Sequence, residues 1–256
     1  MIIINLKQSI MKRTTVLSIL SLLTLCAIVF CCSSCKKSDD NDPSSSNLTN
    51  GKTTAVFNPS VNYGTMTDQD GNVYKTVTIG MQTWMAENLR TNRYNDGTAI
   101  PNITNDAEWG NLTTGAYCNY KNTASVDTIA TYGRLYNWYA VNTGKLAPAG
   151  WHVPTDAEWT QLTDYLGGLS DAGDKLKETG TMHWKNPNAG ATNEVGFTAL
   201  PGGCRLDYGP FSNFGFFGNW WSTTGGASRH LYYNVSYVNC YTSNKKLGLS
   251  IRCVRD

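Results

Sequence analysis

The strongest constraint on the fold is the distribution of aromatic residues and glycines along the 256-residue chain. All 8 tryptophans and all 14 tyrosines lie after residue 62, together with nearly all of the 24 glycines. Aromatic rings supply large buried areas to a core, and glycines allow tight turns. We therefore expect a packed domain with many turns, and a charged fraction of only 16% excludes a coiled coil or a disordered chain.

The charge balance restricts the class of partner. The chain has 21 basic and 19 acidic residues, which give a formal net charge of +2. Nucleic-acid-binding domains carry a much larger basic surplus, gathered on one face. No nucleic-acid partner is therefore expected.

Residues 1–34 have the three parts of a secretory signal peptide. A basic head at Met11-Lys12-Arg13 precedes an apolar run from Val16 to Cys32, and small residues follow it. Met11 is a better start than Met1, because the first ten residues add little to this pattern. The alternative is a signal-anchor helix that stays in the membrane.

The segment Ser33-Ser34-Cys35 resembles a bacterial lipobox of the kind found in Bacteroidetes-type lipoproteins. This resemblance implies that Cys35 carries lipid such as palmitate and begins the mature chain, although Cys31 and Cys32 are alternative acceptors. Residues 35–60 would then form the lipidated cysteine and a flexible tether. We expect an outer membrane lipoprotein that faces the cell exterior, with the periplasmic face as the alternative.

Removal of residues 1–34 changes both the charge and the cysteine count. It takes away three basic residues and no acidic one, which leaves 18 basic and 19 acidic residues and a charge of −1. The domain, residues 61–256, then keeps four cysteines: Cys118, Cys204, Cys240 and Cys253. An even number in an exported domain predicts two disulfides, whose three pairings stay open, and no cysteine or histidine spacing indicates zinc.

The domain contains several strand patterns. Residues 72–79 are rich in β-branched side chains with partial alternation and follow the turn Asp70-Gly71, which predicts one arm of a hairpin. Residues 231–241 predict a strand pair, and residues 248–254 alternate so that Leu249, Ile251 and Cys253 share one face. The acidic segment 68–72 is interpreted as a turn, because Ile79 occupies the position at which a calcium loop needs a carboxylate.

Two short helices are expected. Thr155 and Glu158 form a capping box that starts a helix with Trp159, Leu162 and Leu166 on one face, and Gly167-Gly168 ends it. A second helix is predicted over residues 171–179. The stretch 106–112 repeats the pattern of 156–162, which indicates another capped helix start that Gly110 cuts short.

Several motifs occur in order along the domain and carry a family resemblance. They are Asp70–Gly80, Gln82–Leu89, Gly133–Trp138, Gly150–Trp159, Gly196–Gly203, Trp220–Thr223 and Ser250–Asp256. Together they resemble the Fibrobacter succinogenes major paralogous domain from about Tyr63 to Asp256. The resemblance implies an α+β fold of irregular antiparallel sheets, two short helices and long ordered loops, C-type-lectin-like or formylglycine-generating-enzyme-like, and it implies no particular reaction.

Two cysteines depart from the family pattern. Relatives commonly have Tyr at the position of Cys204, and Cys240 is peculiar to this chain, whereas Cys118 and Cys253 stand where cysteine is usual. The resemblance therefore implies the pairs Cys204–Cys240 and Cys118–Cys253. The cysteine pair of the formylglycine-generating enzymes is absent, so their activity is not carried over.

The sequence contains no recognisable catalytic or metal-binding group. The three histidines, His152, His183 and His230, are not at metal-ligand spacing, and Glu178 and Glu194 are ordinary acid–base candidates. We expect no catalytic residue, no metal and no cofactor, and therefore a chain that is not an enzyme. A hydrolase or a modifying enzyme is the less favoured alternative.

A glycine-rich segment crowded with aromatic residues is the candidate binding surface. Such loops usually lie at the surface, where exposed rings can stack on sugars or on side chains of a partner. The candidate residues are Tyr208, Phe211, Phe214, Phe216, Trp220 and Trp221. The predicted function is non-catalytic binding of a glycan or a partner protein, and the alternative is a structural or adhesive surface component without a small ligand.

Overall fold

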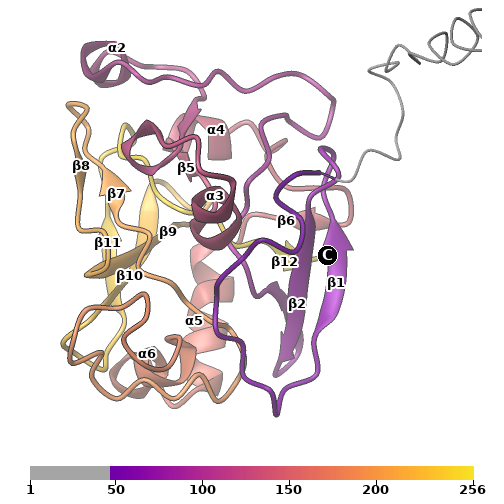
Figure 1. Ribbon diagram of the computed structural model, residues 1–256, viewed down its shortest axis with the longest axis vertical. Coiled ribbons are helices and arrows are strands. Elements are labelled where there is room, and N and C mark those ends of the chain that lie inside the picture. Colours follow the sequence, from indigo (N-terminus) through magenta and orange to yellow (C-terminus); the bar gives the residue numbers. More distant parts are fainter. Residues whose placement is uncertain (1–46) are drawn as a thin grey trace, which may run out of the picture. The chain divides into compact units, whose positions relative to one another are not determined.

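The computed structural model describes residues 47–256, which form small antiparallel sheets and short helices joined by long loops (Figure 1). The strands are β1 Gly64–Thr67, β2 Val73–Ile79, β3 Gln82–Met85, β4 Tyr117–Cys118, β5 Leu135–Tyr136, β6 Trp151–His152, β7 Cys204–Arg205, β8 Phe211–Ser212, β9 Phe217–Trp221, β10 Ala227–Tyr232, β11 Asn239–Thr242 and β12 Val254–Arg255. The helices are α2 Asp106–Gly110, the 3-10 helix η1 Tyr120–Asn122, α3 Val126–Tyr132, α4 Trp138–Val141, α5 Asp156–Tyr165 and α6 Leu169–Leu176. The predicted α+β class is confirmed.

The largest sheet has five antiparallel strands in the order β1-β2-β3-β12-β6. The turn before β2 is closed by Asp68, whose Oδ1 accepts the backbone N–H groups of Asp70 and Asn72. Gly80 has φ 61°, which a glycine adopts without strain, and it makes the tight turn into β3. The hairpin predicted at residues 72–79 is confirmed, and the acidic segment 68–72 forms a turn.

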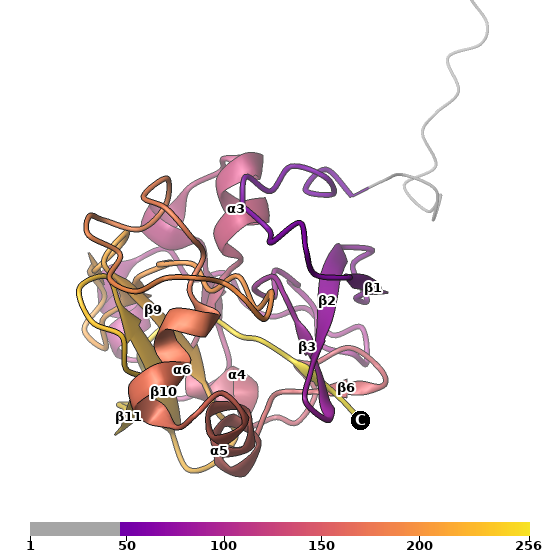
Figure 2. The ribbon, with the colours of Figure 1, turned by 90° about the horizontal axis from the view of Figure 1, so that it is seen from below.

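The second sheet has three strands in the order β11-β10-β9. The strands β10 and β11 are antiparallel neighbours, so a strand pair forms, but it begins earlier than the predicted residues 231–241, because residues 227–230 pair with residues 239–242. Helix α5 lies between this sheet and the five-stranded one (Figures 1 and 2). Its Trp159 contacts Trp84 of β3, with ring centroids 4.8 Å apart, and Trp220 of β9 at 6.5 Å.

The C-terminal segment 248–255 joins the separate sheets. Leu249, Ile251 and Cys253 are all buried in one hydrophobic cluster, as their alternation predicts. The residues between them are also buried, because both faces of this segment are covered. Its backbone pairs in turn with Arg205, Tyr136, Trp220, Trp84 and His152.

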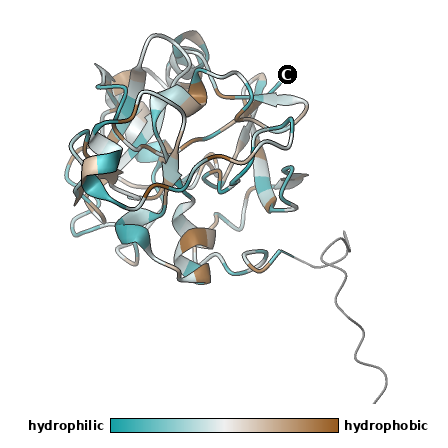
Figure 3. Cartoon of the chain, turned by 90° about the horizontal axis from the view of Figure 1, so that it is seen from above, coloured by the Kyte–Doolittle hydropathy of each residue, from teal (hydrophilic) through white to brown (hydrophobic). Residues whose placement is uncertain are grey.

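The capped helix α5 forms as the sequence predicts. The Thr155 hydroxyl accepts the N–H of Glu158, and the Glu158 carboxylate accepts the N–H of Thr155. Trp159, Leu162 and Leu166 are all buried. The helical ribbons in Figure 3 carry both hydrophobic and hydrophilic segments, which is typical of helices that bury one face.

Helix α6 begins and ends earlier than predicted. It spans Leu169–Leu176, and Lys177 already has extended backbone angles. The Lys177 ammonium is fully buried and donates to the carbonyls of Ala189 and Val235, 2.6 and 2.8 Å away. These bonds hold the chain away from the helix axis, so the helix ends before the predicted residue 179.

The expectation of two helices is wrong for residues 47–256, where five α-helices occur. The additional ones are short and capped by side chains: Ser125 accepts the N–H of Thr128 in α3, and Asn137 accepts that of Ala140 in α4. Helices of one or two turns are not stable in isolation. Tertiary contacts such as the bond from Trp138 Nε1 to the Ser222 carbonyl hold α4 in place.

Residues 47–60 differ from the expected flexible tether, because they are bound to the domain. Asn47 donates to the carbonyl of Asp70, Thr54 N–H donates to the hydroxyl of Thr131, and Asn58 donates to the carbonyl of Asn193. Two of these bonds join asparagine side chains of this segment to backbone carbonyls, and the third joins its backbone to a side chain of α3. We call residues 47–60 the N-terminal strap.

Some expectations lie outside the described residues. They are the signal peptide at 1–34, the lipid on Cys35 and the first part of the tether, up to residue 46. Within residues 47–256, no helix has the length and apolar character needed to cross a membrane.

Candidate functional site

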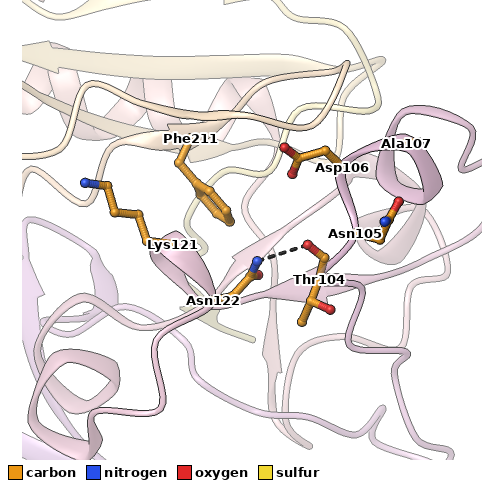
Figure 4. A pocket seen from close by; sticks show the side chains of 7 residues that line it. All are labelled: Thr104, Asn105, Asp106, Ala107, Lys121, Asn122 and Phe211. Carbon is orange, nitrogen blue, oxygen red and sulfur yellow. Dashed lines mark hydrogen bonds between the residues drawn. The ribbon is translucent and has the colours of Figure 1, made fainter.

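An open, mainly polar depression of about 510 Å³ lies where α2, η1 and β8 meet (Figure 4). Three segments far apart in the sequence form its walls. The lining residues are Thr104, Asn105, Asp106, Ala107, Lys121, Asn122 and Phe211.

A buried arginine holds the α2 wall in place. Arg205 has no exposed surface, and its Nη2 lies 2.8 Å from Oδ1 of Asp106, whose side chain is 56% exposed. The same guanidinium donates to the carbonyls of Thr104 and Gly209. It lies over the Phe211 ring at 4.9 Å, so one buried group positions both the carboxylate and the aromatic ring of the depression.

The η1 wall has an unusual backbone. Lys121 and Asn122 have φ values of 50° and 54°, in the left-handed region that residues other than glycine seldom enter. Asn122 Nδ2 donates to the Thr104 carbonyl across 3.0 Å, and this bond ties η1 to the segment before α2 (Figure 4). Lys121 is exposed and forms no ion pair with any residue from 47 to 256.

The aromatic ring of Phe211 stands between the two charged walls. In Figure 4 it lies between the side chains of Lys121 and Asp106. Its edge contacts Tyr120, with centroids 5.3 Å apart, and it is half-buried. The depression therefore combines one aromatic ring, one carboxylate, one ammonium and two amides.

The six predicted ligand-binding aromatics do not form one surface. Phe211 lines the depression, whereas Tyr208 is 66% exposed and lies beside Gly110, outside the lining. Phe214 packs against Tyr120 with centroids 4.6 Å apart. Phe216 is 39% exposed and packs edge-on against another ring, that of Tyr233.

Two of these aromatics are core residues, as their place in the family motifs suggested, and they therefore do not belong to the candidate binding surface. Trp220 and Trp221 are 1% and 0% exposed. Strand β9 is covered on both faces, so its two adjacent indoles enter different hydrophobic clusters. Their N–H groups are also satisfied internally, by Asn88 Oδ1 and the Tyr136 carbonyl.

The predicted disulfides are also corrected by the structure. Cys118, Cys204, Cys240 and Cys253 are all free thiols. The members of each expected pair have different surroundings: Cys118 and Cys253 belong to separate hydrophobic clusters, and Cys204 is buried whereas Cys240 is exposed on β11. Burial raises the pKa of the Cys118 thiol to about 12 and that of Cys204 to about 11, which keeps both thiols protonated.

The histidines and the acid–base candidates lie apart from the depression. His152 contacts Glu158 and Asp256 at 2.7 and 2.6 Å, and His183 contacts the buried Glu178 at 2.7 Å. Glu194 is exposed and pairs with a lysine. Among residues 47–256, no group of three or more His, Cys, Asp or Glu side chains is arranged to hold a metal ion.

Sequence reasoning found only part of the depression. It selected Phe211 but missed Thr104, Asn105, Asp106, Lys121 and Asn122. A signal existed for Asp106, because the helix start predicted at residues 106–112 places this residue in an exposed first turn. No local pattern indicated Lys121 and Asn122, whose position depends on the tertiary bond to residue 104.

The sequence model of the Fibrobacter succinogenes major domain matches residues 77–255 of the chain. This range covers most of the described residues and includes η1, α2 and β8. No curated protein and no solved structure matches the chain.

Proposed function

Since the chain belongs to the Fibrobacter succinogenes major domain family, we propose that it is a cell-envelope lipoprotein whose domain binds a glycan without catalysis. One observation carries this proposal: the Phe211 ring stands between Asp106 and Lys121 in an open depression that amide groups also line. An aromatic face with polar groups around it suits a pyranose, which has both apolar C–H faces and hydroxyl edges.

The size and chemistry of the depression support binding more than hydrolysis. Its volume of about 510 Å³ is in the range of small-ligand sites, which are roughly 300–1,000 Å³. Glycoside hydrolases commonly use two carboxylates flanking the scissile bond. Asp106 is the one carboxylate among the lining residues, so the depression has no second acid–base group of that kind.

A glycan array probed with the full chain, purified in mild detergent, tests this role. We expect F211A to lower the signal for any bound glycan about tenfold, because the ring supplies the stacking contact. F216A is the matched control, since it removes an exposed ring outside the depression. Equal loss in both variants, or the absence of any glycan ligand, would contradict the proposal.

The envelope location is proposed from the N-terminal sequence. The lipobox resemblance at Cys35 implies acylation, and an alkyne-palmitate label should be incorporated by the natural chain but not by C35A. Continued labelling of C35A would indicate that Cys31 or Cys32 is the lipid acceptor instead. Protease added to intact cells should digest the domain if it faces the cell exterior, as we propose. A domain on the periplasmic face should stay intact.

A second function, assembly with a partner protein at the cell surface, is favoured by a separate feature. Met81 is 94% exposed and Tyr165 is 65% exposed. Both line an apolar hollow of about 300 Å³ between the β2–β3 turn and α5. Cross-linking on cells tests this alternative. It would be favoured if the natural chain binds no glycan but captures a partner protein, and if the double variant M81S/Y165S no longer captures that partner.

The proposal extends to the type of fold. Small antiparallel sheets, short helices and long ordered loops support a relation to C-type-lectin-like or formylglycine-generating-enzyme-like domains. An experimental structure compared with both groups tests this relation. A different order of sheets and helices would reject it.

A further inference from the structure

We infer that the depression selects an anionic pyranose, a hexuronate or a sulfated sugar, whose negative group pairs with Lys121. This inference rests on the proposed glycan-binding function and adds the chemical class of the ligand. It follows from the charges, the unused polar groups and the backbone of the described residues.

The charges at the depression do not balance. Asp106 is already neutralised by the buried Arg205 at 2.8 Å. Lys121 lines the same depression and has no acidic partner among residues 47–256, which leaves one positive charge in surplus. A neutral sugar would leave this ammonium unpaired, whereas an anionic sugar forms a charge-assisted contact with it.

The amide groups leave both a donor and an acceptor for sugar hydroxyls. Asn105 uses its Oδ1 to cap α2 at the N–H of Glu108, so its Nδ2 has no partner in the described chain. Asn122 uses its Nδ2 on the Thr104 carbonyl, so its Oδ1 is similarly unused. A pyranose ring between them can accept from one amide and donate to the other.

The backbone conformation of η1 directs the side chains of Lys121 and Asn122 to the depression. Residues other than glycine seldom adopt the left-handed conformation, and a lysine does so less readily than an asparagine. Lys121 and Asn122 both adopt it, and both side chains line the depression. The tertiary bond from Asn122 stabilises this conformation, which places the ammonium across the Phe211 ring from Asp106 (Figure 4).

Titration calorimetry of the full chain with four polysaccharides tests the inference. Polygalacturonate presents carboxylates, dextran sulfate presents sulfates, and galactan and dextran are neutral. We expect one of the anionic polymers to bind at least about tenfold more tightly than its neutral counterpart, and high salt to reduce the difference. The comparison of carboxylate with sulfate identifies which anionic group is preferred.

Three variants assign the preference to Lys121. K121Q removes the charge, and K121N removes it with a residue that enters the left-handed region readily. K52Q is the matched control, because Lys52 is exposed and lies outside the depression. We expect K121Q and K121N to bind the anionic polymer about tenfold more weakly, with neutral polymers unaffected, and K52Q to behave like the natural chain.

Each outcome supports or overturns the inference. Neutral polymers that bind as tightly as anionic ones, or an anionic preference that survives in both Lys121 variants, overturn it while leaving the glycan-binding function intact. Equal loss in K52Q assigns the preference to net charge and also overturns it. Failure of all four polymers and of the glycan array overturns the proposed function itself.

Discussion

The guanidinium of Arg205, which is fully buried, lies 2.8 Å from the exposed carboxylate of Asp106. Arg205 also stacks between the rings of Trp109 and Phe211, at 4.6 and 4.9 Å. The core of the domain and the wall of the depression are therefore connected through one side chain. Substitutions of Arg205 and of Asp106 should therefore distinguish the structural role of Arg205 from its role in the depression.

Replacement of Arg205 by Met should destabilise the domain strongly. The variant leaves the carbonyls of Thr104 and Gly209 without their donor, and the expected loss in the free energy of unfolding is about 3–5 kcal/mol. Urea denaturation measures it. D106N is the control, since the carbonyls of Ile103, Thr104 and Gly209 still hold the guanidinium in it, so we expect a smaller loss; a similar loss in both variants would contradict the assignment.

The stability of the domain should fall between neutral and mildly acidic pH because of His230. Burial, helped by the nearby Arg229, lowers the pKa of His230 to about 4 from 6.5. Between these values the unfolded chain binds a proton that the folded chain does not, so stability is lost as pH falls from about 6.5 towards 4, by up to about 3 kcal/mol. Urea unfolding of the natural chain and H230F should diverge over this interval, and parallel curves would contradict the prediction.

Glu178 should control how tightly the N-terminal strap is held. Its carboxylate is fully buried and accepts the N–H of Val56 at 2.6 Å and a bond from His183 at 2.7 Å. In E178Q one amide oxygen replaces two carboxylate oxygens, and we expect a loss of about 1–3 kcal/mol with faster hydrogen exchange at Val56. E194Q, at an exposed glutamate, should change neither quantity.

The four cysteines of the domain should be recovered as thiols. In the folded protein Cys240 should react first with iodoacetamide, because it is exposed while Cys118, Cys204 and Cys253 are buried. After unfolding without reductant, all four should carry the label in a mass spectrum of the digest. A peptide pair linked by a disulfide would show that this free-thiol state is not the one present in solution.

Local sequence signals predicted the elements that depend on neighbouring residues. The capping box of Thr155 and Glu158 is satisfied within one helical turn, and Gly167 and Gly168 end the same helix with positive φ values. The alternation of residues 249–253 likewise placed Leu249, Ile251 and Cys253 in one cluster. Such patterns can be recognised without knowing what packs against them.

Burial on both faces could not be predicted in this way. Trp220 and Trp221 follow a glycine-rich stretch, which is typical of an exposed loop, yet long-range packing encloses both. Helix α4 is a single turn that bonds to the carbonyls of Ser222 and Lys245, far along the chain. The disulfide prediction failed for the same reason. The number of cysteines does not show which hydrophobic cluster each side chain enters, and Cys118 and Cys253 enter different ones.

The sequence by itself determined the family, the α+β class, the main hairpins and the helix at 156–165, since each rests on motifs or on short-range bonds and periodicity. Only the tertiary structure decided the candidate site. The depression exists because Asn122 bonds to Thr104 and Arg205 bonds to Asp106, residues 18 and 99 positions apart. Contacts at such separations depend on how the whole chain packs, and no local pattern encodes them.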